Sequence, residues 1–117
     1  MRTIIAGSRD GFTYEEVCEG IKASGFNITT VISGTARGVD NYGERWAREN
    51  GIPVERYPAD WVTHGKSAGY KRNELMALKA GIGGQCLAFW YKKTPGTGHM
   101  IDIARRFKLR VYVVEKN

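Results

Sequence analysis

The chain has 117 residues, of which 42% are hydrophobic and 26% are charged, and its formal net charge is +6. These values are typical of one soluble globular domain, which we expect to span residues 1–117. Met1–Ala6 runs straight into a strand and a turn without a signal-peptide pattern, and no apolar run approaches the ~20 residues of a membrane helix, so we expect a cytoplasmic protein. The positive charge favours an anionic partner, but the absence of any block of five basic residues argues against a nucleic-acid-binding tail.

Five short runs, most of them rich in β-branched or aromatic residues, predict strands, and helical patterns lie between them. The strands are expected at Thr3–Ala6, Thr30–Ser33, Pro53–Tyr57, Cys86–Trp90 and Arg110–Val114, and the helices at Thr13–Ala23, Val39–Asn50, Lys71–Ala80 and His99–Phe107. Thr13 and Glu16 have the spacing of a capping box. This alternation predicts an α/β fold, a Rossmann-like domain with a mainly parallel sheet of about five strands and helices on both faces.

Two of these helices have a clear apolar side. In Val39–Asn50 we expect Glu44 to point away from the sheet. In Lys71–Ala80 we expect Leu75, Met76 and Leu78 to pack into the core. These patterns predict which side of each helix contacts the core.

Two segments stand apart from this pattern. The connection Pro58–Tyr70 is longer than the ~4–6 residues usual in compact domains, so we expect a loop there, either functional or without a role. The tail at Glu115–Asn117 is expected to be disordered and to lie far from any glycine-rich turn.

Neither cysteine lies in a redox or metal-binding pattern. Cys18 and Cys86 have no CxxC or His-rich neighbourhood. Both are therefore expected to be reduced thiols in the core, and no metal is expected.

Three glycine-rich turns each follow an apolar run: GSRD at Gly7–Asp10, SGTARGVD at Ser33–Asp40 and TPGTGH at Thr94–His99. A turn from a strand into a helix leaves backbone N–H groups unpaired at the positive end of the helix dipole, and glycine lets a phosphate approach them. Because the carboxyl ends of parallel strands meet at one edge, we expect these turns to form one phosphate site.

Several side chains near these turns have two interpretations. Ser8 offers a hydroxyl, and Arg9 can pair bidentately with a phosphate or a carboxylate, although a single turn of this kind is often structural. Asp40 either binds ribose hydroxyls or stabilises a helix N-terminus. Arg72 is either a phosphate clamp or a surface arginine. His99 either contacts the ligand as a neutral imidazole, acts as a general acid, or has no functional role.

Three aromatic residues, Trp61, Trp90 and Tyr91, either stack on a base or belong to the core. The sequence alone does not decide between these roles.

The order of the motifs is specific. GSRD, SGTARGVDNYGERWA, PADW, GKSAGYKRNELM, and FW followed by GTGHMIDIA resemble the small YspA/YpsA-like branch of the SLOG superfamily, over Thr3–Val114. That superfamily unites DprA/Smf proteins with LOG enzymes, which act on nucleoside monophosphates. The resemblance implies a Rossmann-like fold that binds nucleotides or nucleotide-derived ligands at the carboxyl edge of its sheet, and a homo-oligomer. Together with His99, the candidate binding residues are Gly7, Ser8, Arg9, Gly34, Thr35, Ala36, Arg37, Gly38, Asp40, Arg72, Asn73, Gly96, Thr97 and Gly98.

One position departs from the LOG pattern. LOG enzymes carry a glutamate three residues after the threonine of the last motif, where this chain has Met100. A thioether cannot act as an acid or a base, and Asp102 is about 200° further around the helix. We therefore expect a protein that senses, carries or sequesters a mononucleotide, a cyclic nucleotide or an ADP-ribose-like signal, with no catalytic residue and no cofactor.

Two alternatives stay open at this stage. One is a LOG-like phosphoribohydrolase that cleaves a nucleotide N-glycosidic bond, against which Met100 argues. The weaker one is a DprA-like binder of single-stranded DNA, against which the scattered basic residues argue.

Overall fold

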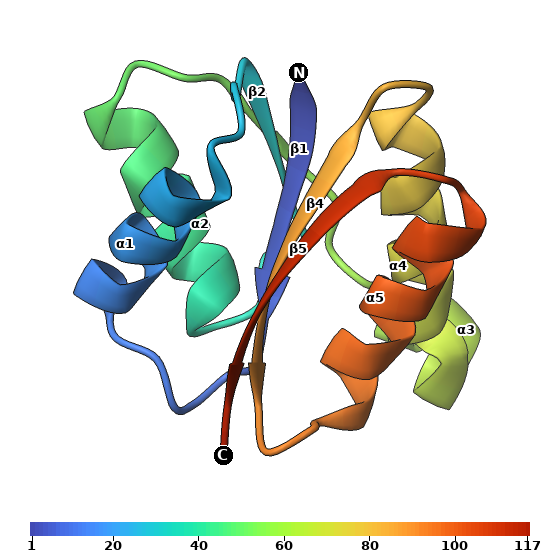
Figure 1. Cartoon of the computed structure of the whole chain (residues 1–117). Helices are drawn as coiled ribbons and strands as arrows, with labels where there is room; N and C mark the ends of the chain where they lie inside the picture. The colour runs from blue at the N-terminus through green and yellow to red at the C-terminus, as the bar shows by residue number, and fades with distance from the viewer.

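A computed structural model describes residues 1–117 (Figure 1). The strands are β1 (Arg2–Gly7), β2 (Thr30–Ser33), β3 (Val54–Arg56), β4 (Gln85–Tyr91) and β5 (Arg110–Lys116). The helices are α1 (Tyr14–Ser24), α2 (Val39–Glu49), α3 (Trp61–His64), α4 (Ala68–Ala80) and α5 (Pro95–Arg106), with a short 3₁₀ turn at Gly65–Ser67. No helix has the length and apolar character needed to cross a membrane.

The strands form one parallel sheet in the order β3-β2-β1-β4-β5. Helices α1 and α2 cover one face, and α4 and α5 cover the other (Figure 1). This arrangement confirms the predicted Rossmann-like α/β fold. The chain runs outward from β1 through β2 to β3 and then returns to β4 on the other side of β1. The loops that follow β1 and β4 therefore diverge, which leaves the crevice where open α/β sheets bind ligands.

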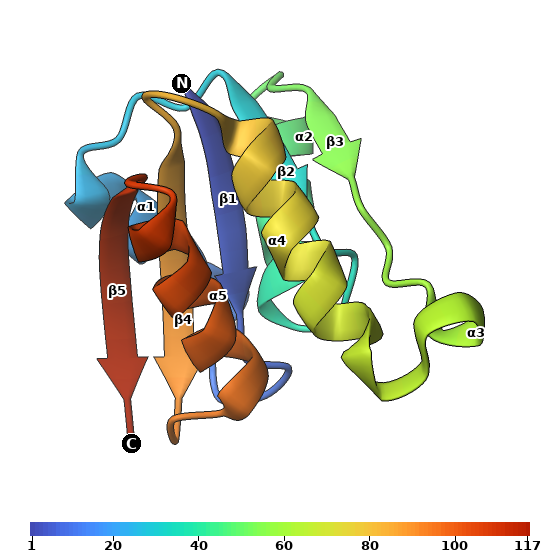
Figure 2. The ribbon, with the colours of Figure 1, turned by 90° about the vertical axis from the view of Figure 1, so that its right-hand side faces the viewer.

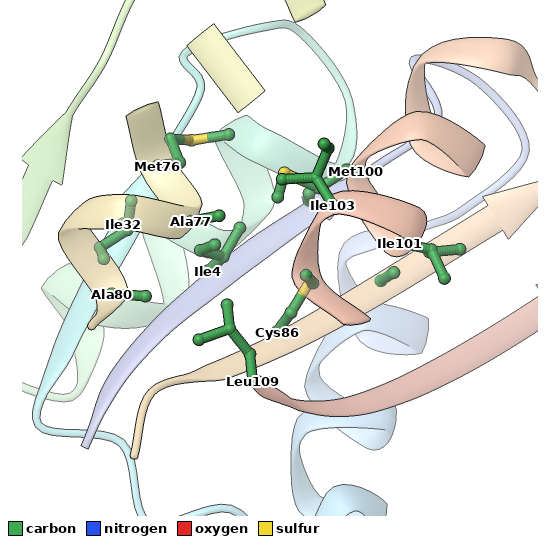
Figure 3. Close-up of a cluster of buried hydrophobic side chains, with 13 residues drawn as sticks. Ile4, Ile32, Met76, Ala77, Ala80, Cys86, Met100, Ile101, Ile103 and Leu109 are labelled. Atoms are coloured by element: carbon green, nitrogen blue, oxygen red, sulfur yellow. The ribbon is translucent and has the colours of Figure 1, made fainter. Parts of the chain in front are cut away.

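Each face of the sheet has its own hydrophobic core. The side covered by α1 and α2 is built around Ile5, Val31 and Phe89. The side covered by α4 and α5 contains Met76 and Met100, each only 1% exposed (Figure 3). Strands covered on both faces have little room for polar residues, which explains the continuous apolar runs of the sequence.

Both later helices begin before the predicted residue. α4 begins at Ala68 and α5 at Pro95, so the TPGTGH motif is the first turn of a helix rather than a turn that precedes one. Proline suits the first helical position because the N–H that it lacks would have no partner there. The segment Pro58–Tyr70 is not a loop throughout, because it contains α3, which stands out from the rest of the chain (Figure 2).

Two predictions of burial are wrong. Glu44 is 7% exposed rather than solvent-facing, because its carboxylate accepts a hydrogen bond of 2.5 Å from the Ser33 hydroxyl. Leu75 and Leu78 are 41% and 62% exposed, and of the three apolar residues only Met76 packs into the core. Small alanines accompany Met76 on the buried side of α4, so the helix lies against the sheet without its leucines.

The ends of the chain and the cysteines also need correction. Cys86 is buried, as predicted, but Cys18 is partly exposed. β5 continues through Lys116, so that residue is not part of a disordered tail. Its ammonium group donates a hydrogen bond of 2.7 Å to the Gly11 carbonyl and pairs with Glu16 at 2.7 Å, which ties the C-terminus to the loop after β1.

Candidate functional site

A cavity of about 560 Å³ lies at the carboxyl ends of β1 and β4. The N-terminal ends of α4 and α5 lie at the same end of the molecule as the arrowheads of these strands (Figure 2). Buried Ala6, Met76 and Met100 line its apolar base. Its other lining residues are Gly7, Ser8, Arg9, Asp10, Ala36, Asp40, Trp61, Lys66, Gly69, Tyr70, Arg72, Asn73, Tyr91, Lys92, Thr94, Gly96 and Thr97.

The predicted site residues divide into two groups. Those that line this cavity are Gly7, Ser8, Arg9, Ala36, Asp40, Arg72, Asn73, Gly96 and Thr97. Those that do not line it are Gly34, Thr35, Arg37, Gly38, Gly98 and His99. The three glycine-rich segments therefore meet at one edge, but their residues have different tasks.

The hydroxyl of Ser8 holds two loops together. Ser8 Oγ accepts a hydrogen bond of 2.9 Å from the backbone N–H of Tyr91 and shares another of 2.7 Å with Thr94 Oγ1. Ser8 is 4% exposed, and its backbone N–H donates to the Phe89 carbonyl at 3.0 Å. This side chain fixes the loop after β4 against the loop after β1.

That contact leaves the N-terminus of α5 uncapped. Thr94 occupies the cap position, yet its side chain makes no capping hydrogen bond. The first hydrogen bond of the helix runs from the N–H of Gly98 to the Thr94 carbonyl at 3.1 Å. The amides of Gly96 and Thr97 precede it and have no acceptor, while Pro95 has no N–H. Two free donors thus lie at the positive end of the helix, beside the cavity.

The two glycines of α5 differ in their surroundings. A Cβ at Gly96 would meet nothing within 4 Å, whereas a Cβ at Gly98 would lie 3.1 Å from the Trp90 ring. Trp90 packs against the core, and its indole N–H donates to the Thr94 carbonyl at 3.0 Å. Gly98 and Trp90 therefore serve packing, and Gly96 is the glycine that opens onto the cavity.

In the second glycine-rich segment, the side-chain carboxylate of Asp40 occupies the turn. Asp40 is 5% exposed, and its carboxylate accepts a hydrogen bond of 3.1 Å from the N–H of Ala36. Burial raises the pKa of Asp40 to about 6, although the Ala36 amide and the positive charge of Arg72 act in the opposite direction. The N–H of Thr35, in a left-handed conformation with φ of 67°, donates to Ser33 Oγ at 3.0 Å. This turn has already used amides that could have held a phosphate.

Arg72 joins α4 to this turn. Its guanidinium donates to the Gly34 carbonyl and, at 3.1 Å, to the side-chain oxygen of Asn73. A Cβ at Gly34 would lie 2.6 Å from an Arg72 nitrogen and 2.9 Å from the Asp40 carboxylate. Glycine at this position therefore leaves room for the arginine, which lies between the second turn and the cavity.

His99 lies behind the wall of the cavity. Its ring stacks on Tyr70 with a centroid distance of 4.2 Å and an interplanar angle of 27°. Its Nδ1 accepts a hydrogen bond of 3.2 Å from the Asn73 amide, which also donates to the Gly96 carbonyl at 3.3 Å. Burial lowers the pKa of His99, which favours the neutral imidazole. The histidine thus supports residues that line the cavity and is not one of them.

The charges around the cavity are mainly positive. Arg9, Lys66, Arg72 and Lys92 line it, and none of them belongs to an ion pair. The opposing carboxylates are Asp40 and Asp10, and Asp10 pairs with Arg37 at 3.3 Å. No group of three or more His, Cys, Asp or Glu residues comes together in a way that could hold a metal ion.

The sequence patterns do not single out Lys66, Tyr70 or Lys92. Lys66 lies in the 3₁₀ turn before α4, Tyr70 lies in the first turn of α4, and Lys92 follows β4 in a left-handed conformation with φ of 50°. Lys66 and Tyr70 fall within Pro58–Tyr70, the connection that the sequence marks as unusually long, and Lys92 lies just before the segment Thr94–His99; these positions are the signals that could have found them.

These features define a Rossmann-like domain with a cationic cavity at the point where the strand order reverses. Residues 1–64 match the model of the YspA, cpYpsA-related SLOG family. The chain is also 37% identical over 115 residues to the Gene 61 protein of Mycobacterium phage D29, an alignment that covers 90% of this chain and 89% of the phage protein. No solved structure matches the chain. The chain belongs to the YspA, cpYpsA-related SLOG family, in agreement with the resemblance of its motifs.

Proposed function

We propose that this protein binds a nucleotide or a nucleotide-derived ligand, as a sensor, carrier or sequestering protein, with a phosphate at the N-terminus of α5. The observation that carries the proposal is the pair of free amides at Gly96 and Thr97, which no side chain caps and which adjoin a cationic cavity. An uncapped helix N-terminus costs about 1 kcal/mol relative to a capped one, and a bound phosphate would supply the missing acceptor.

The choice of α5 over α2 follows from electrostatics. The Asp40 carboxylate already lies at the N-terminus of α2. A phosphate about 4 Å from an ionised carboxylate would be opposed by about 4 kcal/mol per pair of unit charges at the effective dielectric of a protein surface. The first turn of α5 has no acidic residue. Arg9 and Lys92 line the same cavity, and its two carboxylates, Asp10 and Asp40, are already paired with Arg37 and with the Ala36 amide.

The dimensions favour a small ligand. A volume of about 560 Å³ falls within the range of about 300–1,000 Å³ for small-molecule sites. Its base is apolar and its walls carry the polar groups, as is usual for pockets that orient a ligand by a few hydrogen bonds.

The residue at the bottom of the cavity favours binding without hydrolysis. Met100 lies there with 1% exposure, and a thioether supplies neither a proton nor a base. The carboxylates that do line the cavity have other partners: Asp40 accepts from the Ala36 amide, and Asp10 pairs with Arg37.

Thermal unfolding with a ligand panel tests the proposal. AMP, cyclic AMP, ADP-ribose and NAD are expected to raise the melting temperature at millimolar concentration, since a ligand at 100 times its Kd stabilises a fold by about 2.7 kcal/mol. Gly96→Val should keep the fold, because its Cβ meets open space, and should lose the effect because the branched side chain blocks the phosphate. The matched control is Asp102→Val on the exposed side of the same helix. No shift with any of these ligands would refute the proposal, as would equal shifts in wild type and Gly96→Val.

A further inference from the structure

Two large aromatic side chains line the cavity and remain exposed. Trp61 is 54% exposed and Tyr70 is 45% exposed; Trp61 is the first residue of α3, and Tyr70 lies in the first turn of α4. Exposed apolar surface gathered at a cavity marks a place where a ligand or a partner binds. Flat aromatic faces are suited to stacking on the π-face of a nucleobase.

Tyr70 is held in place by a chain of contacts that reaches the phosphate end. Its ring stacks on His99, His99 accepts a hydrogen bond from Asn73, and Asn73 donates to the Gly96 carbonyl. Asn73 is 5% exposed, so this support is inside the protein. The position of the aromatic ring is thereby fixed relative to the free amides of α5.

Trp61 is fixed from its own side. It is the first residue of α3, which Asp60 caps by accepting a hydrogen bond of 3.0 Å from the N–H of Thr63. A Cβ at Gly69 would lie 3.6 Å from Trp61 Cη2, so the indole lies close to the backbone at the start of α4. The ring therefore rests against the protein at Gly69 while about half of its surface stays open.

We infer that Trp61 and Tyr70 form the base-binding end of the cavity, so that the ligand is an intact nucleotide whose base stacks on these rings while its phosphate lies at α5. This inference rests on the proposed function and deepens it, because it selects nucleotides over sugar phosphates. Purine nucleotides bind more tightly than pyrimidine nucleotides, since the larger base buries more stacked surface. His99 and Asn73 are positioning residues for Tyr70.

Calorimetry with AMP and ribose 5-phosphate tests this assignment, because ribose 5-phosphate carries a hydroxyl group where AMP carries the base. Trp61→Ala and Tyr70→Ala are each expected to weaken AMP binding by about 5- to 150-fold, the range for loss of one base-stacking contact, and to leave ribose 5-phosphate binding unchanged. The matched control is Val62→Ala, which lies beside Trp61, is 99% exposed and does not line the cavity. It should bind both probes like wild type.

The role of His99 has its own readout. His99→Ala should weaken AMP binding selectively, and His99→Phe should restore part of it because a flat ring again supports Tyr70. A merely structural histidine would lower the melting temperature in both variants while leaving the ratio of AMP to ribose 5-phosphate affinity as in wild type.

The outcomes separate the two proposals. If wild type binds neither probe nor any other nucleotide, both proposals fail. If wild type binds ribose 5-phosphate as tightly as AMP, or if both aromatic variants keep wild-type AMP affinity, the base-binding assignment is overturned and the phosphate site stands.

Discussion

Asp40→Asn is expected to stabilise the fold at neutral pH. The Asp40 carboxyl group is 5% exposed, and burial raises its pKa from 3.8 to about 6. Asparagine has nearly the same shape and keeps an oxygen that can accept the hydrogen bond from the N–H of Ala36. It carries no charge, so the substitution removes the cost of keeping an ionised group in the interior.

The sign and size of the effect follow from the two pKa values. The folded state binds more protons than the unfolded state between pH 3.8 and about 6, so the contribution of Asp40 is complete below pH 3.8 and is lost as the pH rises to about 6. At 1.36 kcal/mol per pH unit, the loss amounts to about 3 kcal/mol. Above about pH 7 the variant should therefore be more stable than wild type by up to that amount.

Denaturant unfolding of both proteins from about pH 4 to pH 8 measures this difference. Comparing the two proteins at each pH cancels the contributions of the other titrating groups to the unfolding free energy. One of these is His99, whose lowered pKa makes its contribution change with pH in the opposite direction to that of Asp40. The difference in unfolding free energy should grow from near zero at the acid end to its full value at neutral pH. A difference that stays constant with pH, or a wild type that gains on the variant as pH rises, would refute the reasoning.

Three further predictions concern single side chains. Arg72→Ala should weaken nucleotide binding by about 10- to 100-fold through loss of a charged hydrogen-bond donor, measured by calorimetry against Lys22→Ala, an exposed change on α1. Equal affinities would contradict it. Lys116→Ala should cost about 0.2–1 kcal/mol in denaturant unfolding because it removes the partly exposed pair with Glu16, and an unchanged stability would show that the pair contributes nothing. Prolonged incubation with AMP should release no free base, since Met100 lies where an acid would be needed, and chromatographic detection of adenine would contradict this.

Much of the fold is determined by neighbours along the chain. The alternation of apolar runs with helical patterns predicts the parallel sheet, because strands covered on both faces admit few polar residues. The capping box at the start of α1 is confirmed: the N–H of Glu16 donates to Thr13 Oγ1 at 3.2 Å, and the N–H of Thr13 donates to the Glu16 carboxylate at 2.9 Å. Such contacts span a few residues, so local spacing is enough to identify them.

The sequence also placed the glycine-rich segments at one sheet edge, since parallel strands direct every following turn to the same end. It could not decide which segment has free amides. That depends on the contact between Ser8 and Thr94, which lie 86 positions apart in the chain. Because Thr94 bonds to Ser8, α5 is left without a cap. Periodicity and local propensity contain no information about such a pair.

The direction of individual side chains was likewise decided by tertiary packing. His99 is the last residue of a glycine-rich segment, yet it stacks on Tyr70 behind the cavity wall, and Glu44 is buried because Ser33 offers it a hydrogen bond. The type and spacing of a residue specify which hydrogen bonds and ion pairs it can form. Only the approach of distant segments determines whether another part of the protein forms them or leaves them free for a ligand.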